Sequence, residues 1–218
     1  NPILLKTSSL FTGSLQSKMD DGIDGIVISP AKSLKKLEIE ENLIVAESGV
    51  MLGKLVKESV KRNLTGLESL IGVPGTLGGA LVMNAGAFGG EISNYLISVE
   101  VMTSKGKLKS YKATDIDFSY RFSSFSTDEF ILLARFELKF EDPNIISEKR
   151  KIASSGRKTN QPLRFRSAGS VFKNPKDHAA GYLIDKVGLK GKRIGDAEIS
   201  THHANFFINH GNASASDI

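Results

Sequence analysis

Apolar and charged residues alternate strictly over residues 134–140. The apolar positions are Ala134, Phe136, Leu138 and Phe140. Successive side chains of a strand point to opposite faces of the sheet, so this period of two predicts a strand with one buried face. Asp142-Pro143 follows directly, and because proline cannot donate to a sheet ladder, we expect the strand to end before it.

Short apolar runs bounded by Gly, Pro or Asn predict further strands. These runs lie at residues 3–5, 26–28, 43–46 and 204–208. The segment Val99 to Val101 and the residue Leu108 flank a Ser-Lys-Gly-Lys sequence at 104–107, which predicts a β-hairpin. Residues 3–5 have no preceding turn, so they resemble a strand that is already under way.

Helical spacing is clearest over residues 50–62, where apolar residues recur every three or four positions. A second short helix is predicted around residues 183–187, with Gly188 placed to end it. Near the end of the sequence, Ser214 or Ser216 can cap a third helix that has Asp217 in its first turn.

The order of these elements favours an α+β fold, because strands dominate the middle of the chain and do not alternate regularly with helices. Residues 144–157 are polar and helix-favouring, and we expect the hinge between two domains there. Because elements at both ends look cut short, we expect the sequence to be part of a longer protein.

The composition is that of an ordinary globular protein, with 218 residues of which 40% are hydrophobic and 24% charged. The absence of cysteine excludes a disulfide framework, a thiolate metal site and a cysteine nucleophile. No apolar run approaches the ~20 residues of a membrane helix, and the start does not resemble a signal peptide. The net charge of +5 suits an anionic ligand or nucleic acid, and it equally fits a solvated basic surface.

Seven of the 21 glycines fall within residues 71–90. Removing side chains lets successive backbone N–H groups form a concave nest for phosphate oxygens, while Pro74 stiffens the entry and Thr76 and Asn84 offer hydrogen bonds. The alternative is a run of tight turns, which composition alone slightly favours. No Walker sequence and no strand–Gly-x-Gly-x-x-Gly–helix pattern is present.

Two polar segments lie outside this region. Arg121 stands between aromatic residues in 118–125, where it can present a bidentate fork to a carboxylate, or form a surface ion pair at a strand end. Ser170 follows Gly169 in a predicted tight loop that exposes its hydroxyl, although such a serine is usually a turn residue. Lys173 and Asn174 lie close by, and no Gly-x-Ser-x-Gly elbow supports a hydrolase.

The adjacent histidines His202 and His203 could suggest a metal site, but we do not expect one. In a strand the two rings would diverge, and no third ligand stands at short spacing. His178 and His210 are isolated and fit structural or exposed positions.

The segment Gly72 to Gly89 resembles the flavin-binding signature of the UDP-N-acetylenolpyruvoylglucosamine reductase family. The resemblance implies a two-part FAD-binding fold of the vanillyl-alcohol-oxidase type, followed by a C-terminal α+β substrate domain. It implies FAD contacts at Gly72, Pro74, Gly75, Thr76, Gly78, Gly79, Ala80, Asn84, Ala85, Gly86 and Gly89.

Two further motifs are similar to that family's, Tyr120–Phe125 and Gly169–Pro175. By this resemblance Arg121 contacts the enolpyruvyl carboxylate of the substrate and Ser170 is the general acid. The implied substrate-binding residues are Tyr120, Gln161, Lys173 and Asn174. A sequence similar to the family's His-Ala-Asn-Phe stretch follows at residues 203–206.

The reaction implied by the resemblance is NADPH-dependent reduction of UDP-N-acetylglucosamine-enolpyruvate to UDP-N-acetylmuramate, through FAD, in peptidoglycan synthesis. It also implies a monomer in the bacterial cytoplasm, with no nucleic-acid or membrane partner. The alternatives are an FAD-dependent oxidase on the same scaffold and a non-catalytic nucleotide-binding module.

The match departs from the family at both ends. Where the family has a Gly-Ser-Asn loop, this chain has Ser8 and Ser9, which keep part of a phosphate-binding role in our interpretation. The family's third catalytic residue, a glutamate, is expected beyond residue 218. Short spacing between residues 90 and 120 resembles the subclass without the Tyr loop. The implied domains are 1–30 and 31–143, the two flavin-binding subdomains, and 144–218, the substrate domain.

Overall fold

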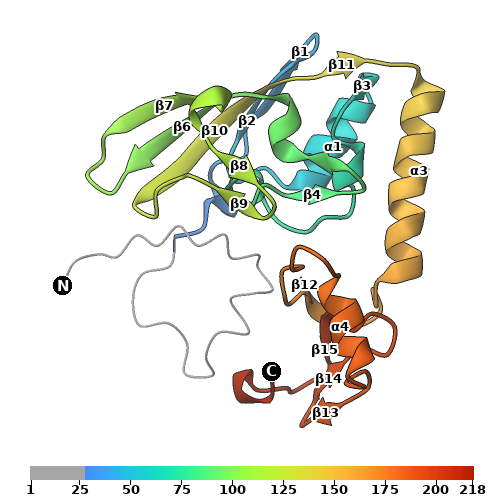
Figure 1. Ribbon diagram of the computed structural model, residues 1–218. Coiled ribbons are helices and arrows are strands. Elements are labelled where there is room, and N and C mark those ends of the chain that lie inside the picture. The colour runs from blue at the N-terminus through green and yellow to red at the C-terminus, as the bar shows by residue number, and fades with distance from the viewer. Residues whose placement is uncertain (1–27) are drawn as a thin grey trace. The chain divides into compact units, whose positions relative to one another are not determined.

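The computed structural model describes residues 28–218 of the chain. These residues form two compact units, the first ending at Ser154 and the second comprising Ser155–Ile218. The boundary falls inside helix α3 (Pro143–Asn160), drawn in yellow and orange in Figure 1. The polar segment predicted as a hinge, residues 144–157, lies within this helix, as its helix-favouring composition suggested.

The first unit is built on a five-stranded antiparallel sheet with the strand order β1-β2-β10-β6-β7. Its strands are β1 (Leu37–Glu40), β2 (Leu43–Glu47), β6 (Leu96–Thr103), β7 (Leu108–Lys112) and β10 (Glu129–Glu137). The strand predicted at 43–46 and the hairpin around 104–107 are confirmed. The strand predicted at 3–5, and residues 26 and 27 of the one predicted at 26–28, lie outside the described residues.

Two helices, α1 (Leu52–Val60) and α2 (Leu77–Val82), supply apolar side chains to the same core as the sheet. The core is formed by fully buried side chains of β2, β6, β10 and the two helices, among them Ile44, Leu52, Leu55, Leu77, Leu81, Val99, Ala134 and Phe136. The amphipathic pattern over 50–62 therefore predicted α1 correctly, and its apolar residues belong to this core.

The alternation over residues 134–140 breaks at its last position. Ala134, Phe136 and Leu138 are at most 1% exposed, whereas Phe140 is 63% exposed. β10 ends at Glu137, and Phe140 belongs to β11 (Lys139–Phe140), which pairs with β3 (Leu64–Thr65) instead of continuing the large sheet. The prediction of a buried Phe140 was wrong because the chain changes its pairing partner after Leu138.

Shorter elements complete the first unit. The remaining strands are β4 (Gly86–Ala87), β5 (Gly90–Glu91), β8 (Phe118–Ser119) and β9 (Phe122–Ser123). The 3₁₀ helices are η1 (Pro30–Lys32), η2 (Glu68–Leu70), η3 (Ile92–Tyr95) and η4 (Ala113–Asp115). β4 pairs with β5 and β8 pairs with β9, so the glycine-rich segment and the Tyr-Arg segment each contribute to a small hairpin.

The second unit contains a four-stranded antiparallel sheet with the order β12-β15-β14-β13. Its elements are β12 (Arg166–Ser170), α4 (Ala180–Lys186), β13 (Arg193–Ile194), β14 (Ala197–Ile199), β15 (Phe206–Asn209) and η5 (Ala215–Asp217). The strand predicted at 204–208 begins only at Phe206. The α+β class is confirmed in the residues described here. None of the helices formed by residues 28–218 combines the length and apolar character that crossing a bilayer needs.

Helix ends in this unit follow the sequence signals. Gly188 has a φ of +72°, the left-handed conformation that ends α4 at low steric cost. Ser214 caps η5: its hydroxyl accepts from the Asp217 amide, while the Asp217 carboxylate accepts from the Ser214 amide. Of the two serines left open as caps, the structure uses Ser214.

Phe136 and Phe140 offer a matched test of the change in pairing. We expect Phe136→Ala to lower the free energy of unfolding by about 3–5 kcal/mol, because it removes a buried ring. Phe140→Ala should change it by less than about 1 kcal/mol, because that ring already contacts water. Urea unfolding followed by circular dichroism measures both, and equal losses would contradict the assignment of Phe140 to the surface.

Candidate active site

The glycine-rich segment is tied to the end of β2. The Leu77 amide donates to the Val50 carbonyl and the Gly78 amide donates to the Ser48 carbonyl, each at 2.8 Å. Residues 77–82 form α2, a helix that neither interpretation of this segment had predicted. Because these two amides already have protein partners, they are not the ones that could cradle a phosphate.

Neighbouring glycines in α2 serve different purposes. A Cβ on Gly78 would lie 3.1 Å from the Ser48 Cβ, so this glycine allows the helix to pack closely on β2. A Cβ on Gly79 would meet nothing within 4 Å, and the same holds at Gly89, where φ is +81°. Open space beside backbone at Gly79 and Gly89 leaves room for a ligand to approach.

The other residues of the predicted cofactor site differ in how deeply they are buried. Ala80 and Ala85 are buried in the hydrophobic core, where they anchor the glycine-rich segment. Gly75 is buried with a φ of +117°, and its carbonyl accepts from the Leu52 amide at 3.0 Å. Gly72, Pro74 and Gly89 are exposed, and Thr76, Gly79 and Gly86 are half-buried. Ser8 and Ser9 lie outside the described residues.

Asn84 is completely buried and bonds inside the protein. Its Nδ2 donates to Glu91 Oε2 at 2.7 Å and to the Ser119 carbonyl at 3.2 Å, while its Oδ1 has no partner. The hydroxyls of Ser48 and Ser69, which lie against Gly78 and Gly90, are also buried without a partner. Leaving such a group unpaired costs about 1–3 kcal/mol each. Three of the buried polar atoms without a partner thus lie in or against the glycine-rich segment, and such atoms are compatible with a functional site.

Arg121 lies at the tip of the β8–β9 hairpin. Because Ser119 pairs with Phe122, Tyr120 and Arg121 form the two-residue turn, and Arg121 adopts a φ of +56°. Its Nη2 donates to the Gly86 carbonyl at 2.8 Å, and its guanidinium carbon lies 5.0 Å from the centre of the Tyr120 ring. The strand-end position that we had considered is therefore wrong. This hydrogen bond brings the Tyr-Arg motif and the glycine-rich segment together.

Two further contacts hold this hairpin. Ser123 Oγ donates to the Val82 carbonyl at 2.7 Å, and the Phe125 ring packs edge-on against Phe118 and Tyr111. The Tyr111 hydroxyl and Lys109 Nζ donate to the buried carboxylate of Glu129 at 2.6 and 2.8 Å. Burial alone would raise the pKa of Glu129, but these two hydrogen bonds hold the pKa below its ordinary value.

Ser170 belongs to the second unit and stands at the end of β12. It pairs with Phe206 of β15 after a register shift, and Gly169 has a φ of +86°. Ser170 is exposed, as predicted, but it lies in a bulged strand and not in a loop. The bulge explains the glycine, because a left-handed residue re-aims the side chain that follows it.

Asn205 holds the segment after Ser170, a role that the residue-level analysis missed. This side chain is 2% exposed, accepts from the Phe172 amide at 2.9 Å and donates to the Phe172 carbonyl at 2.8 Å. The signal for it was the His-Ala-Asn-Phe stretch. Asn174 Oδ1 accepts from the Ala180 amide at 3.0 Å, at the start of α4. Lys173 is exposed, and Gln161 is half-buried just after α3.

The two histidines lie in a bend, so our reason for excluding a metal there was wrong. His202 Nε2 lies 2.6 Å from the Thr159 carbonyl, while His203 Nδ1 accepts from the Asn205 amide at 3.2 Å. Burial lowers the pKa of His203, with the charges of His202 and Lys190 acting in the same direction. Within the described part of the chain, His, Asp and Glu side chains form no group of three that could hold a metal.

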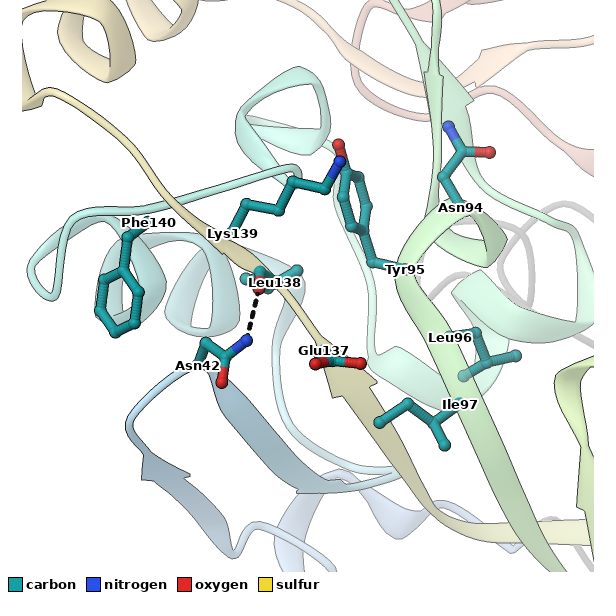
Figure 2. A pocket seen from close by; sticks show the side chains of 9 residues that line it. All are labelled: Asn42, Asn94, Tyr95, Leu96, Ile97, Glu137, Leu138, Lys139 and Phe140. Atoms are coloured by element: carbon teal, nitrogen blue, oxygen red, sulfur yellow. Dashed lines mark hydrogen bonds between the residues drawn. The ribbon is translucent and has the colours of Figure 1, made fainter.

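An open groove of about 730 Å³ lies elsewhere on the first unit. Its lining is formed by the β1–β2 turn, the end of η3, the start of β6 and residues 137–140 (Figure 2). Figure 2 shows the Asn42 amide bonded to the Leu138 carbonyl, at 3.0 Å. None of the predicted site residues lines this groove, so it is separate from the site formed by Arg121 and the glycine-rich segment.

Comparison with known families finds two matching models. Residues 8–111 match an FAD binding domain, and residues 161–218 match the C-terminal domain of UDP-N-acetylenolpyruvoylglucosamine reductase. The first match covers the glycine-rich segment, and the second covers Ser170.

Curated relatives and a solved structure agree with these matches. The UDP-N-acetylenolpyruvoylglucosamine reductase of Clostridium tetani is 44% identical over 91% of this chain and 65% of its own length. The reductase of Exiguobacterium sibiricum is 42% identical over 98% of this chain and 70% of its own length. The crystal structure of the Thermus caldophilus enzyme superposes with a TM-score of 0.83 at 36% identity, covering 94% of this chain and 75% of that one. The chain thus spans about two thirds of the length of the curated relatives named here.

The residues present fit a flavin dinucleotide. Gly79 and Gly89 leave open space beside backbone that a side chain would otherwise fill. Ser48, Ser69 and Asn84 contribute buried polar atoms that still lack partners. Small residues that let backbone approach a dinucleotide are what such a site requires.

The half-buried His203 generates a pH prediction. Its pKa is lower in the folded state, so the stability linked to its neutral form is fully present above the unfolded-state pKa of about 6.5 and decreases as the pH falls through that value. His203→Asn keeps an acceptor for the Asn205 amide and should flatten this dependence. Thermal unfolding between about pH 7.5 and 5.5 measures it. The exposed His178→Asn is the control, and an unchanged slope in His203→Asn would contradict the assignment.

Proposed function

Because this chain belongs to the UDP-N-acetylenolpyruvoylglucosamine reductase family, we propose that it reduces UDP-N-acetylglucosamine-enolpyruvate to UDP-N-acetylmuramate, with NADPH as the electron donor. The observation that carries the proposal is the bond from Arg121 to the Gly86 carbonyl, since it sets an anion-binding group on the flavin-binding segment. In this proposal residues 31–143 are the second flavin-binding subdomain, residues 1–30 are part of the first, and residues 144–218 are the substrate domain. The short spacing between residues 90 and 120 supports the subclass without the Tyr loop.

Charge distribution supports an anionic substrate on the second unit. Residues 155–218 contain ten Lys and Arg against five Asp and Glu, whereas residues 1–154 contain nineteen of each. Residues 155–218 by themselves therefore carry a net charge of +5, equal to that of the whole chain. A substrate that carries a diphosphate and a carboxylate is attracted to such a surface, and Lys173 and Asn174 are the candidates that lie beside Ser170.

FAD, when bound, supplies hydride transfer from NADPH to the enolpyruvyl group. Gly79 and Gly89 would hold it by close backbone approach, together with the neighbouring Thr76 and Gly86. In this proposal these residues bind and orient the flavin. The electrostatic task falls to Arg121 and the proton-transfer task falls to Ser170.

Arg121 has the electrostatic task. When the double bond is reduced, negative charge develops next to the substrate carboxylate and spreads into it. A guanidinium stabilises that charge through planar, bidentate hydrogen bonds. The Gly86 carbonyl and the Tyr120 ring fix the Arg121 side chain before the substrate arrives, which reduces the ordering cost of binding.

Ser170 has the proton-transfer task. Its exposed Oγ would donate a proton to C2 of the substrate. A serine hydroxyl is a weak acid, so it suits only a strongly basic carbon, which is what develops in this reaction. Asn205 supports this role by fixing the backbone of Phe172, two residues beyond Ser170.

Gly79→Ala separates flavin binding from stability. Alanine is the better helix former by about 1 kcal/mol and meets no neighbour, so the free energy of unfolding should stay or rise. FAD affinity should fall about ten-fold or more, which corresponds to about 1.4 kcal/mol, because the methyl group occupies the open space. Fluorescence titration with FAD measures this. Gly53→Ala, an equally open glycine in α1, is the control, and equal affinities in both variants would refute the site.

Ser170→Ala should leave flavin reduction by NADPH intact and slow reoxidation by the enolpyruvyl substrate by roughly 10²- to 10⁴-fold, the range for a general acid. Anaerobic stopped-flow absorbance measures each half-reaction, with Ser167→Ala of the same strand as control. If both half-reactions fall equally, Ser170 is not the acid. If oxygen but not the substrate reoxidises the flavin, the protein is an oxidase and the proposed reaction is wrong.

A further inference from the structure

The β8–β9 hairpin is attached to the glycine-rich segment by hydrogen bonds along its length. Asn84 Nδ2 donates to Ser119 just before the tip, Arg121 donates to Gly86 at the tip, and Ser123 donates to Val82 just after it. The first of these contacts depends on one more residue, Glu91, because the same Asn84 nitrogen also donates to its carboxylate at 2.7 Å.

The two acceptors fix the orientation of the Asn84 amide. Its nitrogen carries two donor protons, and Glu91 Oε2 and the Ser119 carbonyl take one each. A half-turn of the amide would lose both bonds and place Oδ1 against two other oxygens. The fixed orientation leaves Oδ1 buried without a partner. The fixed orientation also defines the geometry at Ser119, the residue before Tyr120-Arg121.

Glu91 also supports the second attachment point. It stands opposite Gly86 in the β4–β5 pair, and a Cβ on Gly86 would lie 2.9 Å from Glu91 Cγ and 3.6 Å from Arg121 Nη1. The Glu91 side chain therefore lies against the residue whose carbonyl accepts from Arg121. The Glu91 side chain thus contacts the Asn84 amide, which holds Ser119, and lies against Gly86, which holds the Arg121 guanidinium.

We propose that Glu91 is a positioning residue which, acting through Asn84 and Gly86, fixes the direction of the Arg121 guanidinium toward the substrate carboxylate. The inference rests on the proposed function, because it assumes that Arg121 binds that carboxylate. It requires that Glu91 provides an acceptor for Asn84 and that it makes no contact with the reacting atoms.

The experiment compares Glu91→Leu, which removes the acceptor, with Glu91→Gln, which keeps one at nearly the same shape. Glu91→Leu should raise the dissociation constant of the enolpyruvyl substrate, and slow reoxidation of the flavin by it, about ten-fold. Flavin content and the rate of flavin reduction by NADPH should not change. Glu91→Gln should restore most of the loss. Glu40→Leu, at an exposed position in β1, is the control for the substitution itself.

A double-mutant cycle with Arg121→Ala shows whether the effect travels through the guanidinium. In the Arg121→Ala background, Glu91→Leu should have no further effect on substrate affinity. A full, additive loss would overturn the proposal, as would a Glu91→Leu variant that loses flavin or fails equally in both half-reactions. If Arg121→Ala itself leaves substrate affinity unchanged, the proposed role of Arg121 fails. If Arg121→Ala weakens substrate binding but Glu91→Leu has no effect, the proposed role of Glu91 fails and the proposed role of Arg121 stands.

Discussion

The bond between the Arg121 guanidinium and the Gly86 carbonyl is the contact on which the candidate site depends. Glycine suits residue 86, because a Cβ there would lie 2.9 Å from Glu91 Cγ and 3.0 Å from the Gly90 carbonyl oxygen. The bond joins two sequence motifs that are 35 residues apart. One glycine thereby couples the glycine-rich segment to the guanidinium that we propose for binding the substrate carboxylate.

The ordered structure around this contact includes two energetically unfavourable features. Arg121 adopts a left-handed backbone conformation, and Asn84 keeps a buried oxygen without a partner. Each costs about 1–3 kcal/mol in general. The large sheet and the buried faces of α1 and α2 offset such losses, because they bury most of the apolar side chains of the first unit in one core. The rigid core and the strained site are therefore parts of one arrangement.

A short apolar run identified β2. Hydrophobic period was enough to identify α1 and the second half of β10, because burial of one face dominates their energy. It failed at Phe140, where a change of strand partner turned an apolar position outward. It also failed at α2, since glycines weaken a helical pattern even where tertiary contacts enforce the helix. His202 and His203 were placed in a strand, but hydrogen bonds of the bend decide their geometry.

The sequence by itself determined the family, the α+β class and the residue types at the candidate site, because glycine spacing and the Tyr-Arg and Gly-Ser motifs are local properties. Only the tertiary structure decided which glycines serve packing and which leave room for a ligand, as Gly78 and Gly79 show. It alone connected Arg121 to Gly86, and Glu91 to Asn84. These relations depend on distances between segments that are remote in sequence, and no periodicity within a segment encodes them.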